Sequence, residues 1–129
     1  EAVAVKAGYT KIARKWQSGD VIELCLDDAV YPVLPPDDSP YKDNYIALRK
    51  GAIVLGVDKR ITDPHAKVSL KESGRLDATA VECPELPYYN LSLGVKQTDG
   101  SLLHVVDYAS AGSTFDQDSE CAAWFERKT

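Results

Sequence analysis

Alternating apolar and polar residues on either side of a short turn constrain the fold of this chain more than any other feature. The residues that share a face are Ile12, Arg14 and Trp16 before the turn, and Ile22, Leu24 and Leu26 after it. Alternation with a period of two is typical of a β-strand with one buried side. The turn itself, Gln17-Ser18-Gly19-Asp20, contains a glycine that can adopt positive φ. We predict a hairpin of strands Thr10–Trp16 and Val21–Leu26, with Trp16 in the core and Arg14 stacked over its ring.

The length and composition of the chain suit one globular domain. The chain has 129 residues, of which 44% are hydrophobic, and its formal net charge is −5. This apolar share allows a core, so we predict a single domain over residues 1–129. The acidic balance argues against nucleic-acid binding, which depends on basic patches. No apolar run approaches the length of a membrane-spanning helix, so we expect no membrane partner either.

The first residues resemble the interior of a β structure. The chain begins Glu1-Ala2-Val3 and contains no methionine, and Ala2–Lys6 reads as a short strand or the end of one. We expect a fragment of a longer protein, whose targeting signal would lie outside it. Both a cytoplasmic and an exported location are therefore compatible with the sequence.

The middle of the chain combines a proline-rich connector with a strongly apolar run. The connector, Asp27–Asn44, contains four prolines, which exclude a helix or a central strand and allow an extended edge segment. The run Tyr45–Val57 is rich in β-branched residues and is interrupted by Gly51. We predict a central strand with a bulge or bend at this glycine.

The second half of the chain predicts further short strands. Asp99-Gly100 separates the apolar segments Asn90–Lys96 and Leu102–Tyr108, which is a strong hairpin signal. The other predicted strands are Leu76–Cys83 and Cys121–Arg127. About seven short strands with turns at irregular intervals predict an all-β fold, an antiparallel β-sandwich or jelly-roll-like domain with little helix.

Catalytic chemistry has few candidates in this sequence. His65 follows Asp-Pro in a turn and is expected in solvent, whereas His104 lies within a strand and is expected to be structural. No serine lies in a Gly-x-Ser-x-Gly elbow, and no cysteine has a nucleophile context. We therefore predict no catalytic residue, no cofactor and no enzymatic activity for this chain.

The cysteines and acidic residues do not predict a metal site. Cys25, Cys83 and Cys121 are widely spaced and lack the spacing of zinc ligands. We expect three free thiols, with one disulfide as the alternative for an exported protein. The spacing Asp116-x-Asp118-x-Glu120 could hold calcium, but it lacks the frame of an EF-hand, and a solvated acidic edge is the preferred interpretation.

Two aromatic residues are candidates for carbohydrate contact. Tyr88 and Tyr89 follow Glu85-Leu86-Pro87 and could lie at a loop rim, where an aromatic face can stack on a sugar ring. Trp124 lies in the closing strand, so we expect it in the core.

Three motifs give the chain a resemblance to a known family. The first is Gly8-Tyr9 leading into Arg14-x-Trp16 and Gly19-Asp20, and the second is Ala47-Leu48-Arg49-Lys50-Gly51-Ala52-Ile53-Val54. The third is Val106-Asp107-Tyr108-Ala109 followed by Gly112 and Ala123-Trp124-Phe125. Together they resemble the non-catalytic C-terminal β-sandwich region of glycoside hydrolase family 127, β-L-arabinofuranosidase-like proteins long described as a domain of unknown function.

This resemblance implies a role without catalysis. The family's catalytic glutamate and zinc-binding cysteines belong to a helical barrel that precedes the β region, and no cysteine here occupies such a motif. Lys50 and Ala52 replace the family's arginine and proline, and Ser110-Ala111 replaces its Asn-Arg, so the chain resembles a divergent branch and the substrate does not transfer. We expect an accessory β-sandwich module of a bacterial glycoside hydrolase in carbohydrate metabolism, with the catalytic barrel of the same parent chain as its partner. The alternative is a carbohydrate-binding module.

Overall fold

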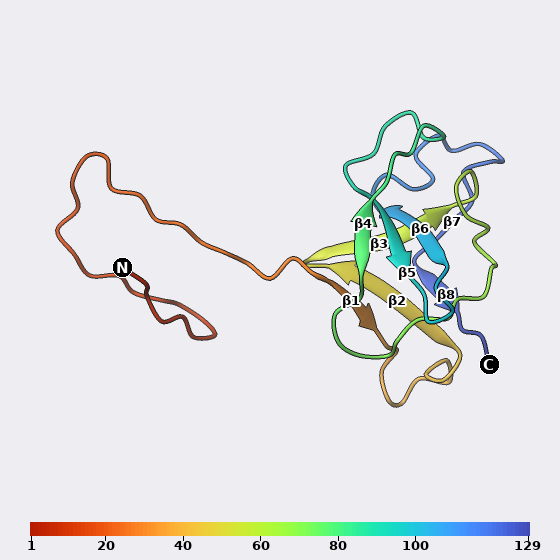
Figure 1. The fold of residues 1–129 in the computed structure, drawn as a ribbon, viewed down its shortest axis with the longest axis horizontal. Helices are drawn as coiled ribbons and strands as arrows, with labels where there is room; N and C mark the ends of the chain where they lie inside the picture. Colours follow the sequence, from red (N-terminus) through yellow and green to blue (C-terminus); the bar gives the residue numbers. More distant parts are fainter.

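The computed structural model describes all residues from 1 to 129 and contains only β-strands, turns and loops (Figure 1). It has no helix that is long and apolar enough to cross a bilayer. The eight strands are β1 (Val30–Val33), β2 (Tyr45–Lys50), β3 (Ile53–Asp58), β4 (Ala78–Ala80), β5 (Ser92–Lys96), β6 (Leu102–Asp107), β7 (Cys121–Ala122) and β8 (Trp124–Glu126).

All strand pairs are antiparallel, and the sheet curls on itself. The strand order is β1-β2-β3-β6-β5-β4, while β8 pairs with β2 and β7 pairs with β3. The two ends of this order meet where the Leu76 N–H donates to the Val30 carbonyl at 2.9 Å. The predicted all-β, antiparallel class is therefore confirmed.

One apolar cluster fills the inside of the curled sheet. Its members come from six strands and from the loop before β4, and they include Val30, Ile46, Leu48, Leu55, Val57, Val68, Leu70, Leu76, Leu93, Val95, Leu103, Val105 and Phe125. Along β5 and β6 the core members Leu93, Val95, Leu103 and Val105 are two positions apart, so they share one face. Val106, on the other face, is buried in a second, smaller cluster.

The hairpin predicted around Asp99-Gly100 is confirmed. In β5 and β6 the register runs from Ser92 opposite Val106 to Lys96 opposite Leu102. Gly100 has a φ of 87°, a left-handed conformation that suits glycine. Its N–H donates to the Gln97 carbonyl at 3.0 Å, which closes the turn.

The apolar run Tyr45–Val57 is a hairpin and not the single strand that the sequence predicts. β2 and β3 pair antiparallel, with Lys50 opposite Ile53 across a tight turn. Gly51 has a φ of 57°, so the glycine reverses the chain where we expected a bulge or bend. Gly51 does interrupt the run, as predicted, but the chain reverses there completely and forms two strands.

The predicted N-terminal hairpin over residues 10–26 is wrong. The turn forms, with the Asp20 N–H donating to the Gln17 carbonyl at 3.1 Å, but neither flanking segment is a strand, nor is Ala2–Lys6. Trp16 is 48% exposed and not in the core. The Arg14 guanidinium does lie over its ring, 5.1 Å from the centroid, as expected.

The hairpin fails to form because nothing covers its apolar face. Residues 1–26 extend away from the curled sheet as an arm (Figure 1), and no hydrogen bond joins them to residues 27–129. A lone two-stranded hairpin is marginal in water without a third strand or a packed face. We call residues 1–26 the arm and residues 27–129 the body.

Two further strands are shorter than predicted. Leu76–Cys83 contains only the three-residue strand β4, and Cys121–Arg127 is divided at Ala123 into β7 and β8. The connector Asp27–Asn44 contains the edge strand β1, which confirms the expected extended edge segment.

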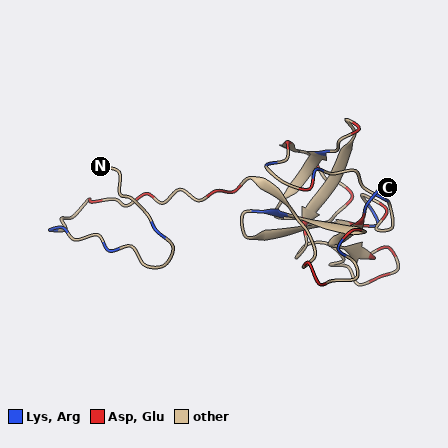
Figure 2. Cartoon of the chain, turned by 90° about the horizontal axis from the view of Figure 1, so that it is seen from below, with Lys and Arg blue, Asp and Glu red and all other residues tan.

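Charges of both signs are interspersed over the body, while the basic residues of the arm lie mostly in its outer half (Figure 2).

Candidate functional site

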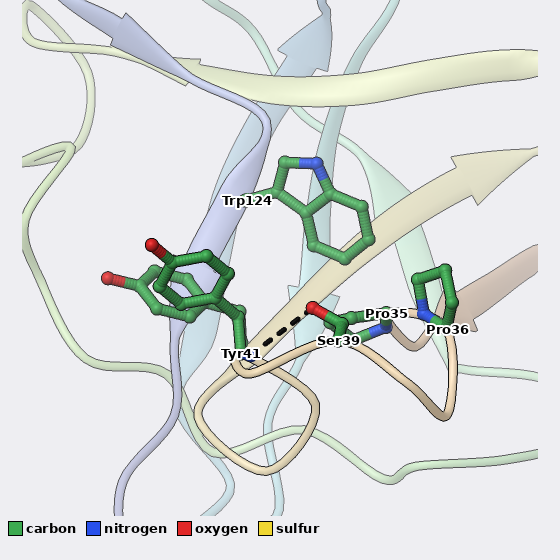
Figure 3. Close-up of a pocket in the computed structure, with 6 residues that line it drawn as sticks. Pro35, Pro36, Ser39, Tyr41 and Trp124 are labelled. Atoms are coloured by element: carbon green, nitrogen blue, oxygen red, sulfur yellow. Dashed lines mark hydrogen bonds between the residues drawn. The ribbon is translucent and has the colours of Figure 1, made fainter.

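The candidate site is an open surface pocket of about 480 Å³ lined by aromatic rings and prolines (Figure 3). It lies where the β1–β2 loop meets the start of β2 and the start of β8. We call it the aromatic pocket, and its lining residues are Pro35, Pro36, Ser39, Tyr41, Tyr45 and Trp124.

Successive turns hold the loop side of the aromatic pocket. The Ser39 N–H donates to the Pro36 carbonyl at 2.9 Å, and the Tyr45 N–H donates to the Tyr41 carbonyl at 3.2 Å. The Ser39 hydroxyl also accepts a hydrogen bond from the Tyr41 N–H at 3.2 Å. Proline and serine favour such turns because proline presets φ and the serine side chain can bond to nearby backbone. The loop therefore has a defined conformation.

Two of the three aromatic rings of the pocket pack against each other, and the third lies on the outer face of β8. Tyr41 and Tyr45 pack edge to face, with ring centroids 5.7 Å apart and an angle of 85° between the planes. On β8, Phe125 enters the core, so the preceding Trp124 must lie on the opposite face. Figure 3 shows its indole reaching over the loop that carries Pro35, Pro36 and Ser39. Trp124 is 45% exposed and Tyr41 is 60% exposed, so both rings are accessible.

The lining of the pocket offers aromatic faces and hydroxyl groups but no charged side chain. The nearest ion pair of the loop, Lys42 with Asp37 at 2.7 Å, is not part of the lining. Such a lining can hold a flat, uncharged ligand by stacking and by hydrogen bonds to hydroxyls.

The predicted contact residues Tyr88 and Tyr89 lie outside the aromatic pocket and differ in exposure. Tyr88 is exposed, whereas Tyr89 packs on the small apolar cluster of Cys83, Leu86 and Val106. The Tyr89 hydroxyl accepts a hydrogen bond from the Cys83 N–H at 3.4 Å. The two rings do not stack on each other, and their role in carbohydrate contact stays a prediction.

The aromatic pocket differs from the sequence-based prediction, in which Trp124 lies in the core. A strand exposes alternate faces, so Trp124 and Phe125 could not both point inward, and that alternation is the signal that was available. No pattern in the sequence indicates that Tyr41 and the prolines lie near Trp124, because they are more than eighty positions away from it.

The two histidines occupy different environments. His65 is exposed, and its Nε2 lies 2.6 Å from Glu120 Oε1. His104 is half-buried, and its Nε2 lies 2.7 Å from the Ser92 hydroxyl. Burial lowers the pKa of His104, against a smaller opposing effect of the Glu85 charge. Both positions agree with the predicted solvated and structural histidines.

The cysteines and the acidic loop form no shared site. All three cysteines are free: Cys25 is exposed on the arm, Cys83 is buried, and Cys121 is half-buried in β7. Burial raises the pKa of the Cys83 thiol. No group of three histidine, cysteine or acidic side chains has the geometry of a metal site. This includes the segment Asp116-x-Asp118-x-Glu120.

Two buried carboxylates, Asp58 and Asp107, hold loops of the body in place. Asp58 accepts hydrogen bonds from the Arg60 guanidinium at 2.7 and 2.8 Å and from the Gly112 N–H at 2.7 Å. Asp107 accepts hydrogen bonds from Asn90 and from the Ser110 hydroxyl, the latter at 2.7 Å. Burial raises the pKa of each carboxyl, but these hydrogen bonds outweigh burial and leave both pKa values below normal.

We expect the stability of the body to fall in two steps as the pH is lowered. The pKa of His104 is lower in the folded state than its value of about 6.5 in the unfolded chain. Below about pH 6.5 the unfolded chain therefore binds a proton that the folded chain does not, and the free energy of unfolding falls. The pKa values of Asp58 and Asp107 are also lowered, so their contribution is lost below about pH 4. Urea unfolding between pH 8 and pH 2.5 measures both steps.

The variant Asp107→Asn serves as the control for this pH dependence. It should keep the first step and weaken the second, because only one of the two buried carboxylates then titrates. A midpoint that is constant from pH 8 to pH 3 in the unaltered chain would contradict the expectation.

We found no protein-family model that matches the chain, and no curated protein or solved structure that is similar to it.

Proposed function

We propose that this chain is the non-catalytic C-terminal β module of a bacterial glycoside hydrolase, and that it supports a helical catalytic barrel in the same parent chain. The observation that carries the proposal is the exposed apolar surface of the arm. Val21 is 84% exposed and Leu26 is 76% exposed, and Ile22 and Leu24 between them are also in solvent. Contiguous exposed apolar residues of this kind mark a surface that another part of a protein covers.

The arm is suited to packing outside the body. No hydrogen bond ties residues 1–26 to the body, and the nearest anchors are the Asp27 bonds to Tyr31 and Arg75. The alternation of apolar residues along residues 21–26 would give one buried face once a third strand or a packed surface is present. The resemblance to family 127 names the helical barrel as that surface.

A carbohydrate-binding module is the second candidate function, and the aromatic pocket is the observation that favours it. Exposed tryptophan and tyrosine rings are suited to stacking on the apolar face of a sugar. The two candidates are compatible, because the arm and the aromatic pocket involve different residues.

Leu24→Asp, made both in this chain and in the parent protein, tests the proposed function. Covering Leu24 is worth about 1.5–3 kcal/mol, so in the parent protein the amides of Val21–Leu26 should exchange hydrogen at least about tenfold more slowly than in this chain alone. Leu24→Asp should remove this protection in the parent protein. The same substitution in the isolated chain is the control and should leave its urea midpoint unchanged, because Leu24 contacts solvent there.

Two results would contradict the proposal. One is an arm that exchanges equally fast in both proteins, which would mean that nothing in the parent covers it. The other is turnover of aryl-arabinofuranosides by this chain alone, which would mean that the module is itself catalytic.

A further inference from the structure

We propose that the aromatic pocket binds one uncharged sugar ring, with a face of the sugar stacked against Trp124. The choice of a sugar over other flat ligands rests on the proposed function, which places the chain in a glycoside hydrolase. The position of the site rests on the geometry of the pocket alone. It differs from the pair Tyr88 and Tyr89 that the sequence suggests.

The exposure of Trp124 follows from the fold of β8. Phe125 is buried in the core and pairs opposite Ile46 of β2, while Trp124 pairs opposite Ala47. Neighbouring residues of a strand point to opposite faces, so Trp124 is held outside the core. A tryptophan in that position leaves a large apolar face in water unless a ligand covers it.

The opposite wall of the pocket is formed before any ligand arrives. The edge-to-face packing of Tyr41 on Tyr45 and the turns from Pro36 to Tyr45 hold this wall in place. Prolines have little conformational freedom to lose, and the tyrosine rings are already packed. A site that needs little ordering on binding keeps more of its interaction energy.

The chemistry of the lining selects an uncharged ligand with hydroxyl groups. No charged side chain lines the pocket, so nothing there would compensate for burying a ligand charge. The Ser39 hydroxyl accepts from the Tyr41 N–H and still has its own proton to donate. The cavity of about 480 Å³ lies within the size range of small-molecule sites.

A proline-rich peptide is the main competing ligand, because grooves lined by tyrosine, tryptophan and proline also bind extended proline-rich segments. Such a peptide needs a row of contacts along an extended groove. Here the lining residues converge on one cavity (Figure 3). This geometry favours a single ring over a peptide.

Titration of the 129-residue chain, followed by NMR of its tryptophan indole N–H groups, tests the proposal. The probes are L-arabinose, D-xylose, D-galactose and D-glucose, their methyl glycosides, and a decaproline peptide. We expect at least one sugar to shift the Trp124 indole signal in a saturable way. Trp16, on the arm, is the internal control, and its signal should not move.

Two matched variants test whether Trp124 contributes to the affinity for the sugar. Trp124→Ala should weaken binding of that sugar by about tenfold or more, because it removes the stacking face, as measured from the backbone amide shifts of the pocket loop. Trp16→Ala, the same change outside the pocket, should alter the affinity by less than about twofold. Intact backbone spectra of both variants show that the body is folded.

Three results would overturn the inference. The first is the absence of saturable shifts for every sugar up to roughly 100 mM, a concentration a hundred times a Kd of 1 mM. The second is binding of decaproline but of no sugar. The third is an equal shift of both tryptophan signals. These results are independent of the hydrogen exchange of the arm, which reports on the proposed function. A pocket that binds no sugar would therefore leave the role of the arm intact, and sugar binding with an uncovered arm would refute only the role of the arm.

Discussion

Asp58→Ala is expected to lower the free energy of unfolding of the chain by about 3–5 kcal/mol. The Asp58 side chain is completely buried, and it accepts the N–H groups of Arg60 and Gly112. Its removal leaves the mostly buried Arg60 guanidinium without its partner and the Gly112 N–H without an acceptor. Losing one partner of a buried ion pair costs more than the pair contributes, because the remaining charge is uncompensated. Urea unfolding at pH 7 measures the loss.

Asp37→Ala is the matched control for Asp58→Ala. Asp37 also forms an ion pair, with Lys42 at 2.7 Å, but its side chain is 94% exposed. Exposed ion pairs contribute little, so this variant should unfold at the same urea concentration as the unaltered chain. A loss of under about 1 kcal/mol for Asp58→Ala would show that the surroundings relax, or that water replaces the carboxylate.

Phe125→Ala is also expected to lower the free energy of unfolding, by about 3–5 kcal/mol. Phe125 is among the largest fully buried side chains, and it joins the short strand β8 to the core beneath β2. Truncation removes its buried apolar surface and leaves a cavity, because the surrounding strands relax only in part. Folded domains are stable by about 5–15 kcal/mol, so the variant should be close to unfolded at 37 °C. Thermal and urea unfolding followed by circular dichroism measure the effect.

Trp124→Ala is the control on the same strand. Trp124 is also a large aromatic residue, but it lies on the outer face and is partly exposed. We expect Trp124→Ala to lower the free energy of unfolding by much less than Phe125→Ala, while it weakens the proposed sugar binding. Equal losses for the two variants would mean that Trp124 belongs to the core, and the aromatic pocket would then have no accessible platform.

The sequence predicted best the features whose signals are local. The Asp99-Gly100 turn and its two flanking segments form the expected hairpin, because a turn and an alternating pattern together specify a register. The prolines of Asp27–Asn44 limited this segment to an edge strand for a local reason too, since proline lacks the N–H that a central strand requires. The all-β class follows from many such local signals.

The errors arose where burial depends on residues far away in the chain. The alternation around Trp16 is as regular as that of β5 and β6, yet no surface covers it in this structure. An alternating pattern states that one face should be buried, but it does not state by what. The same limit explains Trp124, whose strand contributes Phe125 to the core and leaves the indole outside.

The candidate site also depends on contacts between segments that are distant in the sequence. Tyr88 and Tyr89 were predicted from their place after Glu85-Leu86-Pro87, at the rim of a loop, and that prediction uses only local sequence. The aromatic pocket combines residues from the β1–β2 loop with one residue of β8, and only the pairing of β2 with β8 brings them together. No pattern within either segment indicates this proximity.

The amino-acid sequence by itself determined the strand chemistry, the turns and the antiparallel all-β class, because backbone preferences and turn residues act over a few positions. Only the tertiary structure decided which apolar residues are covered, how the sheet curls and where the aromatic rings converge. Those features depend on contacts between distant segments, which form only when the whole chain buries its apolar surface at once.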